Sequence, residues 1–217
     1  MYGSPHIVSD VMTRNVVTVG REAAFKDLVR LMGRWRISAV PVLEGERRVI
    51  GVVSEADLLP KEEFRDSDPD RLTQRLRMAD LAKAGALTAE ELMTSPAVTV
   101  HAEATLAEAA RIMALCHVKR LPVVDSEGTL EGLVSRGDLL KVFLRPDDEI
   151  AEEVRRDVVD VLFPAPVEPV RVAVARGVVT LTGRVPDVAR IPLAVRLVRS
   201  VEGVVNVDCH LAVARVG

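Results

Sequence analysis

A stretch of about fifty residues occurs twice in this chain, and this repeat constrains the fold more than any other feature of the sequence. Residues 10–59 align with residues 91–140 at a constant shift of 81 positions without a gap, and 18 of the 50 aligned pairs are identical. Both copies end on one pattern, "GVVSEADLL" at 51–59 and "GLVSRGDLL" at 132–140. Repeated sequence folds into repeated structure. We therefore expect two similar units that pack around a pseudo-twofold axis.

Within each copy, the residue types change in the same order. β-Branched runs at 15–19 and 96–100 predict strands, and apolar residues at helical spacing predict helices over 22–35 and 103–116. Two further strands follow, and a short helix begins at the serine of the Ser-x-x-Asp pattern. Each copy is expected to fold as β-α-β-β-α. The proline in the strand after the long helix favours a short strand or an edge strand there.

Two regions lie outside the repeat. Residues 60–88 separate the copies and are expected to form a connector with one helix around Leu72, Leu76 and Leu81. A different unit begins after Pro146. Its expected elements are a helix (147–163), a β-hairpin (170–185), a second helix (about 187–200) and a strand (204–213), in the order αββαβ. Pro192 lies inside the second helix, so this helix either starts late or is kinked.

The landmarks of the repeat resemble a known family. Met-Thr, Val-Thr-Val, Pro-Val and Gly-x-x-Ser-x-x-Asp-Leu-Leu follow one another in both copies, and over residues 8–143 the chain resembles tandem CBS domains, regulatory modules of the cystathionine β-synthase type. This resemblance implies a domain pair with two clefts that bind adenine nucleotides or related adenosyl ligands, such as AMP, ADP, ATP or S-adenosylmethionine. It also implies a homodimer built through the pair.

The last unit resembles a BON domain, on the strength of "GVVTLTGRV" at 177–185 and "GVVNV" at 203–207. The resemblance implies that contact with membrane lipid is possible through this unit. The expected fold class is α/β (α+β), with two CBS repeats packed as a pseudo-twofold pair and a small αββαβ BON domain. The expected domain limits are 8–59 for CBS domain 1, 60–88 for a helical connector, 89–145 for CBS domain 2 and 147–217 for the BON domain.

The Ser-x-x-Asp stretches, Ser54 to Asp57 and Ser135 to Asp138, have two interpretations. Serine is a good N-cap, and an acid three residues later completes a capping box that needs no ligand. Aspartate is shorter than the glutamate or glutamine that this box prefers, and a short carboxylate can instead hold two ribose hydroxyls. The resemblance assigns the two aspartates to ribose and the two serines to ribose or phosphate. Both interpretations remain open.

The two copies differ in their basic residues. Lys119 and Arg120 precede "LPV" in the second copy, where the first copy has Ser38 and Ala39. The resemblance assigns Arg120 to a phosphate group. Arg136 puts a positive charge at a helix start, which the helix dipole disfavours, and this suggests an anionic partner. A solvated basic patch is the alternative. The second copy is expected to contribute more of the phosphate contacts.

An apolar wall of the clefts is expected from four residues, two on the first strands and two just after the repeated glycines. They are Val17, Val98, Val52 and Leu133. All four suit the hydrophobic core equally well.

Composition limits the classes of function. The net charge of −3 argues against general binding to nucleic acid. No apolar stretch approaches the roughly 18 residues that span a bilayer, and the first residues do not resemble a secretory signal, so a cytoplasmic protein is expected. The four histidines are scattered, and Cys116 and Cys209 are expected in the core. We expect no metal site, no catalytic residues and no catalytic cofactor.

These features predict a non-enzymatic regulatory protein. It would bind an adenosine-containing ligand in the cleft of the CBS pair and pass its state to the BON domain or to an unidentified protein target. The alternatives are a dimeric interaction scaffold that needs no ligand and a peripheral lipid-binding protein that acts through residues 147–217.

Overall fold

The computed structural model describes residues 6–65, 71–164 and 169–213. These residues divide into two compact units, residues 7–136 and residue 6 together with residues from 137 onward. Parts of the expected connector (66–70) and of the expected BON domain (165–168 and 214–217) lie outside the described residues.

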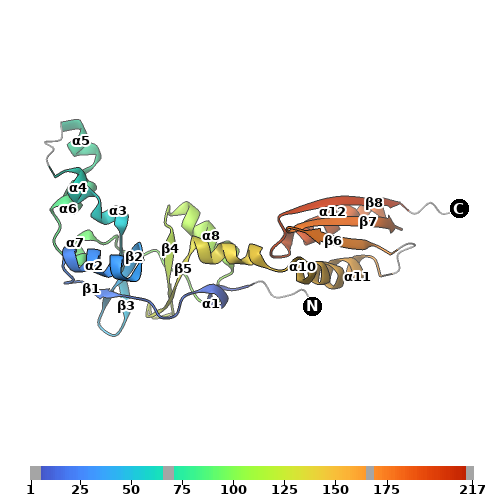
Figure 1. Cartoon of the computed structure of the whole chain (residues 1–217), viewed down its shortest axis with the longest axis horizontal. Helices are drawn as coiled ribbons and strands as arrows, with labels where there is room; N and C mark the ends of the chain where they lie inside the picture. Colours follow the sequence, from blue (N-terminus) through green and yellow to red (C-terminus); the bar gives the residue numbers. More distant parts are fainter. Residues whose placement is uncertain (1–5, 66–70, 165–168, 214–217) are drawn as a thin grey trace. The chain divides into compact units, whose positions relative to one another are not determined.

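The first copy of the repeat forms a small sheet covered by one long helix (Figure 1). Its elements are α1 (Val8–Val11), β1 (Val19–Gly20), α2 (Phe25–Trp35), β2 (Ala39–Glu44), β3 (Arg48–Ser54) and α3 (Glu55–Leu58). The strand order is β1-β2-β3, with β1 parallel and β3 antiparallel to β2. Leu28 and Met32 of α2 are buried with Val40, Val42 and Val53 of the sheet. The predicted apolar face of the helix therefore forms this core.

The second copy repeats this arrangement. Its elements are α7 (Ala89–Leu92), α8 (Leu106–Leu115), β4 (Arg120–Val124), β5 (Leu130–Ser135) and α9 (Arg136–Leu140). The strands β4 and β5 are antiparallel. In place of a first strand, Val100 makes a single parallel bridge to Val123. The division between the two compact units falls within α9.

The two copies exchange the segments that precede their first strands. Thr13 pairs antiparallel with Leu133, and both backbone N–H···O bonds between them measure 2.9 Å. Thr94 pairs with Val52 in the same way, at 2.9 and 3.2 Å. Each of these four residues is 81 positions from its counterpart in the other copy. This reciprocal pairing confirms the predicted pseudo-twofold relation.

The pseudo-twofold axis passes between β3 and β5. Arg48, the first residue of β3, forms an antiparallel bridge with Thr129, and the two are counterparts of each other at the shift of 81. Beside this bridge, the N–H of Val49 donates to the carbonyl of Gly128 and the N–H of Leu130 donates to that of Arg47, each at 3.0 Å. The two repeats are thus joined by backbone hydrogen bonds at their centre.

The first strand of each copy is shorter than predicted. Of residues 15–19 only Val19 lies in β1, and residues 96–100 contribute only the bridge at Val100. The preceding residues of both segments are held by the opposite repeat, so these segments cannot run along their own sheet for their whole length. Pro41 lies in the middle strand rather than at an edge, but β1 pairs only with Val42 and Leu43. Pro41 therefore has no partner residue in β1 to which an N–H would have to donate.

The connector contains more helices than the single one predicted. They are α4 (Pro60–Glu63), α5 (Arg71–Leu76) and α6 (Met78–Gly85). The break between α5 and α6 falls at Arg77, whose Nε donates to Asp80 at 2.8 Å and whose guanidinium pairs with Glu63. Leu72 and Leu76, around which the single helix was predicted, lie in α5 and are exposed.

The C-terminal unit has the predicted αββαβ order. After a 3₁₀ turn (Lys141–Leu144), its elements are α10 (Asp147–Val154), a π-helical turn (Arg155–Val159), α11 (Asp160–Leu162), β6 (Arg171–Ala175), β7 (Val178–Val185), α12 (Ile191–Ser200) and β8 (Asn206–Val213). The strand order is β6-β7-β8, with β6 antiparallel and β8 parallel to β7. Residues from both helical segments and all three strands share one core around Ile150, Val179, Leu181 and Val198. Pro192 lies in the first turn of α12, so this helix starts late and is not kinked by it.

The two cysteines differ from each other. Cys209 of β8 is half-buried and packs against the core of the C-terminal unit. Cys116 is exposed, which contradicts the prediction that it continues the core face of its helix. The reason is that α8 ends at Leu115 and Cys116 is its C-cap residue. Across the described parts of the chain, no helix is both long enough and apolar enough to span a membrane.

Candidate ligand-binding site

The Ser-x-x-Asp stretches begin at equivalent ends of the two antiparallel strand pairs. Ser54 ends β3 and lies opposite Ala39 of β2, while Ser135 ends β5 and lies opposite Arg120 of β4. A short helix starts directly after each serine. The structure therefore brings Arg120 and Ser135 together at one end of the β4–β5 pair.

The segments that carry Val17 and Val98 run between the repeats. Residues 13–19 lead from the pairing with β5 of the second copy to β1, which pairs with β2 of the first copy. Residues 94–100 lead from the pairing with β3 of the first copy to the bridge with β4 of the second copy. Val17 thus belongs to a segment anchored near Ser135, and Val98 belongs to one anchored near Ser54. The pairing threonines Thr13 and Thr94 were not predicted.

The four residues expected to line an apolar wall are only half-buried. These residues are Val17, Val52, Val98 and Leu133. By contrast Val53 and Val134, which directly follow Val52 and Leu133, are fully buried. Successive residues of a strand point to opposite faces of the sheet. Val52 and Leu133 therefore keep some apolar surface accessible close to Ser54 and Ser135, whereas Val53 and Val134 are packed in the core.

The carboxylate of Asp57 is engaged within the protein. Its Oδ2 atom accepts hydrogen bonds from the N–H of Ser54 at 2.7 Å and from the Ser54 hydroxyl at 2.6 Å. Its Oδ1 atom pairs with the ammonium group of Lys83, which comes from α6 of the connector. Asp57 is 8% exposed. The backbone bond is the capping-box bond that the N-cap interpretation predicts; Lys83 was not predicted.

In the second copy, Asp138 lies in the first turn of α9 and pairs with Lys141 at 2.8 Å. This lysine is 59% exposed, whereas Lys83 is 21% exposed. An ion pair with one largely exposed partner is weakened by hydration of that partner and by salt. Arg136 is exposed, and its guanidinium donates to the carbonyl of Val118 at 3.1 Å.

The guanidinium of Arg120 donates to the hydroxyl of Ser38, which directly precedes β2 of the first copy. Arg120 is half-buried. This contact joins the two repeats near the starts of β2 and β4. A neutral hydroxyl is a weaker partner for a guanidinium than an anion such as phosphate. Ser38 was not among the predicted site residues.

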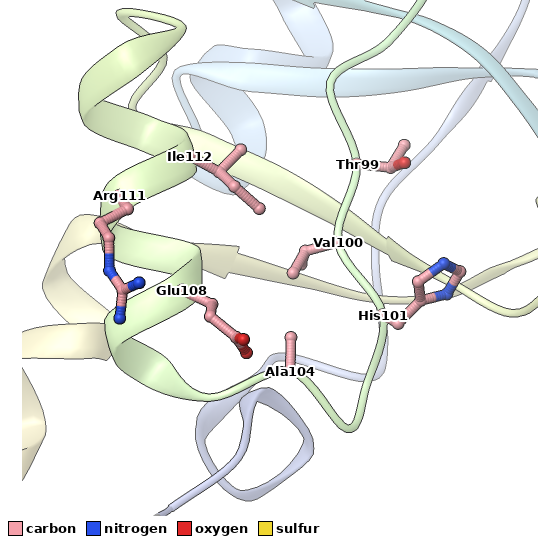
Figure 2. A pocket seen from close by; sticks show the side chains of 7 residues that line it. All are labelled: Thr99, Val100, His101, Ala104, Glu108, Arg111 and Ile112. Carbon is pink, nitrogen blue, oxygen red and sulfur yellow. The ribbon is translucent and has the colours of Figure 1, made fainter.

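The second copy also has a depression that is lined by other residues. A depression of about 450 Å³ is lined by Thr99, Val100, His101, Ala104, Glu108, Arg111 and Ile112, and none of these is a predicted site residue. Figure 2 shows Glu108, Arg111 and Ile112 on α8, opposite the loop that carries Thr99 and His101. Glu108 is held by the N–H and hydroxyl of Thr105, which lower the pKa of its carboxyl group. Glu108 therefore serves as a helix cap at the rim of this depression.

No group of three or more histidine, cysteine, aspartate or glutamate side chains is arranged to hold a metal ion within residues 6–65, 71–164 and 169–213.

Comparison with known proteins identifies both parts of the chain. The family model described as CBS domain matches residues 8–61 and 89–145, and the model described as BON domain matches residues 146–215. The uncharacterised protein MJ1426 of Methanocaldococcus jannaschii is 28% identical over 158 residues, which cover 65% of this chain and 94% of that protein.

Two further relatives are similar to the paired repeat. Inosine-5'-monophosphate dehydrogenase of Halalkalibacterium halodurans is 31% identical over 121 residues, or 56% of this chain, but the match spans only 21% of that enzyme's length. The crystal structure of CBSX2 of Arabidopsis thaliana in complex with AMP has a TM-score of 0.57 and 29% identity, and covers 64% of this chain and 97% of that chain.

Proposed function

Since this chain belongs to the CBS-domain proteins and carries a BON domain after its CBS pair, we propose that it is a non-enzymatic sensor of an adenosine-containing ligand. The observation that carries the proposal is the reciprocal pairing of Thr13 with Leu133 and of Thr94 with Val52. The end of the last strand of each repeat thereby lies beside a segment of the other repeat. A ligand bound there contacts both repeats, so it can favour one packing of the pair over another.

The proposed contacts follow from the chemistry of the side chains. Asp57 and Asp138 accept hydrogen bonds from the ribose hydroxyls, and Ser54 and Ser135 donate to ribose or phosphate oxygens. The half-buried Val17, Val52, Val98 and Leu133 provide apolar surface for the base. Arg120 binds the phosphate group, because it lies opposite Ser135 and its present partner is a neutral hydroxyl. Arg136 adds a second positive charge at this end of β5.

AMP is the ligand to test first. The CBSX2 structure that resembles this chain at 29% identity is a complex with AMP. ADP and ATP carry the same adenosine group, and S-adenosylmethionine carries the 5'-deoxyadenosyl group with the same base and ribose hydroxyls. The second copy offers Arg120 and Arg136 to any phosphate chain.

We assign residues 8–59 to CBS domain 1, 60–88 to the helical connector, 89–145 to CBS domain 2 and 147–217 to the BON domain. We further propose that the protein acts in the cytoplasm as a homodimer. Large apolar side chains at the surface of the CBS pair support a second copy as partner. Trp35 at the end of α2 is 56% exposed, Leu115 at the end of α8 is 80% exposed and Leu59 is 64% exposed. The state of the pair is passed through this dimer or the connector to the BON domain or to a protein target.

One observation favours a second candidate function, a dimeric scaffold that binds no nucleotide. The carboxylate of Asp57 already accepts three polar contacts, from Ser54 and Lys83, within the free protein. In this alternative, both Ser-x-x-Asp stretches act only as helix caps.

A thermal-shift screen of the purified full chain distinguishes the two functions. The compounds are AMP, ADP, ATP, S-adenosylmethionine and, as a phosphate-free control, adenosine. A ligand at about a hundred times its dissociation constant stabilises the folded state by about 2.7 kcal/mol, which gives a measurable rise in the unfolding temperature. A rise with at least one of these compounds supports the sensor. No rise with any of them rejects it in favour of the scaffold.

A further inference from the structure

The helix α6 of the connector lies against the first Ser-x-x-Asp stretch. It packs against α3, the short helix that contains Asp57, and its Lys83 forms the ion pair with the Oδ1 atom of this aspartate. With two bonds from Ser54 on Oδ2 and one from Lys83 on Oδ1, these contacts take three of the carboxylate's roughly four acceptor positions, so two ribose hydroxyls can both bind only after a change of partner. The partner that comes from outside the CBS repeat is Lys83.

Polar contacts, rather than a buried apolar face, hold α6 in place. None of its side chains is buried, and Met78 at its start is 69% exposed. Besides Lys83, the ammonium group of Lys61 donates to the carbonyl of Ala84 at 2.9 Å and lies 5.1 Å from the centre of the Phe25 ring. Segments with few buried apolar contacts open at a small fraction of the free energy of global unfolding.

The two copies differ in the position and exposure of the lysine that pairs with the aspartate. The lysine that pairs with Asp138 is its own neighbour Lys141, three residues along the chain and mostly exposed. The lysine that pairs with Asp57 is 26 positions away, is mostly buried and is attached to a helix that covers the stretch.

We propose that α6 is a displaceable lid on the first cleft and that Lys83 is its latch. An adenosine ligand must release Lys83 from Asp57 before its ribose can bind there, and binding then moves the connector. The ion pair of Asp138 with Lys141 involves no residue of the connector, and we expect the second cleft to fill first. This inference rests on the proposed function and extends it, because it makes the connector the element that reports occupancy of the first cleft.

The test isolates the first cleft. In an Asp138→Ala background, AMP is titrated calorimetrically into the full chain with and without Lys83→Met, which removes the charge and keeps a side chain of similar length. Loss of an ion pair worth about 1 kcal/mol is expected to tighten AMP binding about fivefold. The matched control is Lys26→Met on the exposed side of α2, which removes the same charge from the same repeat and is expected to leave the affinity unchanged. Unchanged or weaker binding with Lys83→Met overturns the latch.

A second measurement needs no ligand. Hydrogen exchange of the amides of residues 78–85 is compared between wild type, Lys83→Met and Lys26→Met in the absence of nucleotide. Faster exchange in Lys83→Met alone supports the latch, and equal exchange in all three overturns it. If the wild-type chain binds no AMP, the sensor function fails for this ligand, but the exchange measurement still decides whether Lys83 holds the helix.

Discussion

The side chain of Met12 packs on Gly132 of the opposite repeat so closely that a Cβ atom on this glycine would lie 2.6 Å from the methionine sulphur. Met93 packs on Gly51 in the same way, and the two pairs are counterparts at the shift of 81. Neither glycine has an unusual backbone conformation that would explain its presence. The repeated glycines therefore make room for a methionine that comes from the other repeat.

Gly132→Ala is expected to destabilise the protein by about 1 to 3 kcal/mol, because the added methyl group would also approach the carbonyl oxygen of Thr13 at 3.1 Å. Gly33→Ala is the control. Gly33 lies within α2 with no atom within 4 Å of an added Cβ, so alanine there should stabilise by about 0.5 to 1 kcal/mol. Urea unfolding of both variants measures the difference. Equal effects would contradict the close packing between the repeats.

Arg120→Met is expected to weaken AMP binding about tenfold, since a hydrogen bond between two charged groups is lost. Binding of adenosine, which lacks the phosphate, should change little. Ser38→Ala controls for the structural role of Arg120, because it removes the present partner of the guanidinium and leaves the charge in place. Parallel titrations with AMP and adenosine make the comparison. An equal loss for both ligands, or the same loss in Ser38→Ala, would show that Arg120 does not bind phosphate.

Acid should destabilise the protein partly through Glu91. The N–H groups of Leu87 and Thr88 donate to its carboxylate and lower its pKa. A carboxyl group whose pKa is lower in the folded state stabilises above its unfolded pKa, and this contribution is lost as the pH falls through the folded value. Glu91→Gln should therefore lose less stability than wild type between about pH 6 and about pH 3. Urea midpoints across this range test the point, and parallel profiles would contradict it.

In the C-terminal unit, Asp147 fixes the turn of the β6–β7 hairpin. Its carboxylate accepts the N–H groups of Arg176 and Gly177 at 2.7 and 2.8 Å, and both turn residues have positive φ, 53° and 73°. Asp147→Ala should speed hydrogen exchange of these two amides by about tenfold or less, the equivalent of about 1 kcal/mol. Asp148→Ala, at the exposed neighbouring position, should leave them unchanged. Equal exchange in both variants would show that Asp147 does not hold the turn.

The repeat predicted the architecture because both copies bury the same helix face on the same strands. Leu28 and Met32 in one copy correspond to Ala109 and Met113 in the other, and all four are buried. The pairing of Thr13 with Leu133 could not be predicted, because a segment that crosses to the other repeat has the same local pattern as one that stays. This crossing also shortened the predicted first strands.

The sequence supplied the candidate residues of the proposed site but not their present contacts. The candidates Ser54, Asp57 and Ser135 were chosen because they recur in the aligned pattern, and Arg120 was chosen because it departs from it. Lys83 lies outside the repeat, so it has no counterpart in the other copy that would draw attention to it. The chain has 29 lysines and arginines, and the sequence alone does not distinguish Lys83 from the others. The exposure of Cys116 was missed for a related reason, since apolar periodicity does not say at which residue a helix ends.

The most direct test of the account is a calorimetric titration of AMP into the full chain as wild type, as Asp138→Ala and as Asp57→Ala with Asp138→Ala. We predict saturable binding to the wild type, weaker binding to the single variant because the remaining cleft is covered by α6, and none to the double variant. Circular dichroism of the three proteins confirms that each is folded. Wild-type affinity and stoichiometry in the folded double variant would contradict the claim that the two Ser-x-x-Asp stretches form the nucleotide sites.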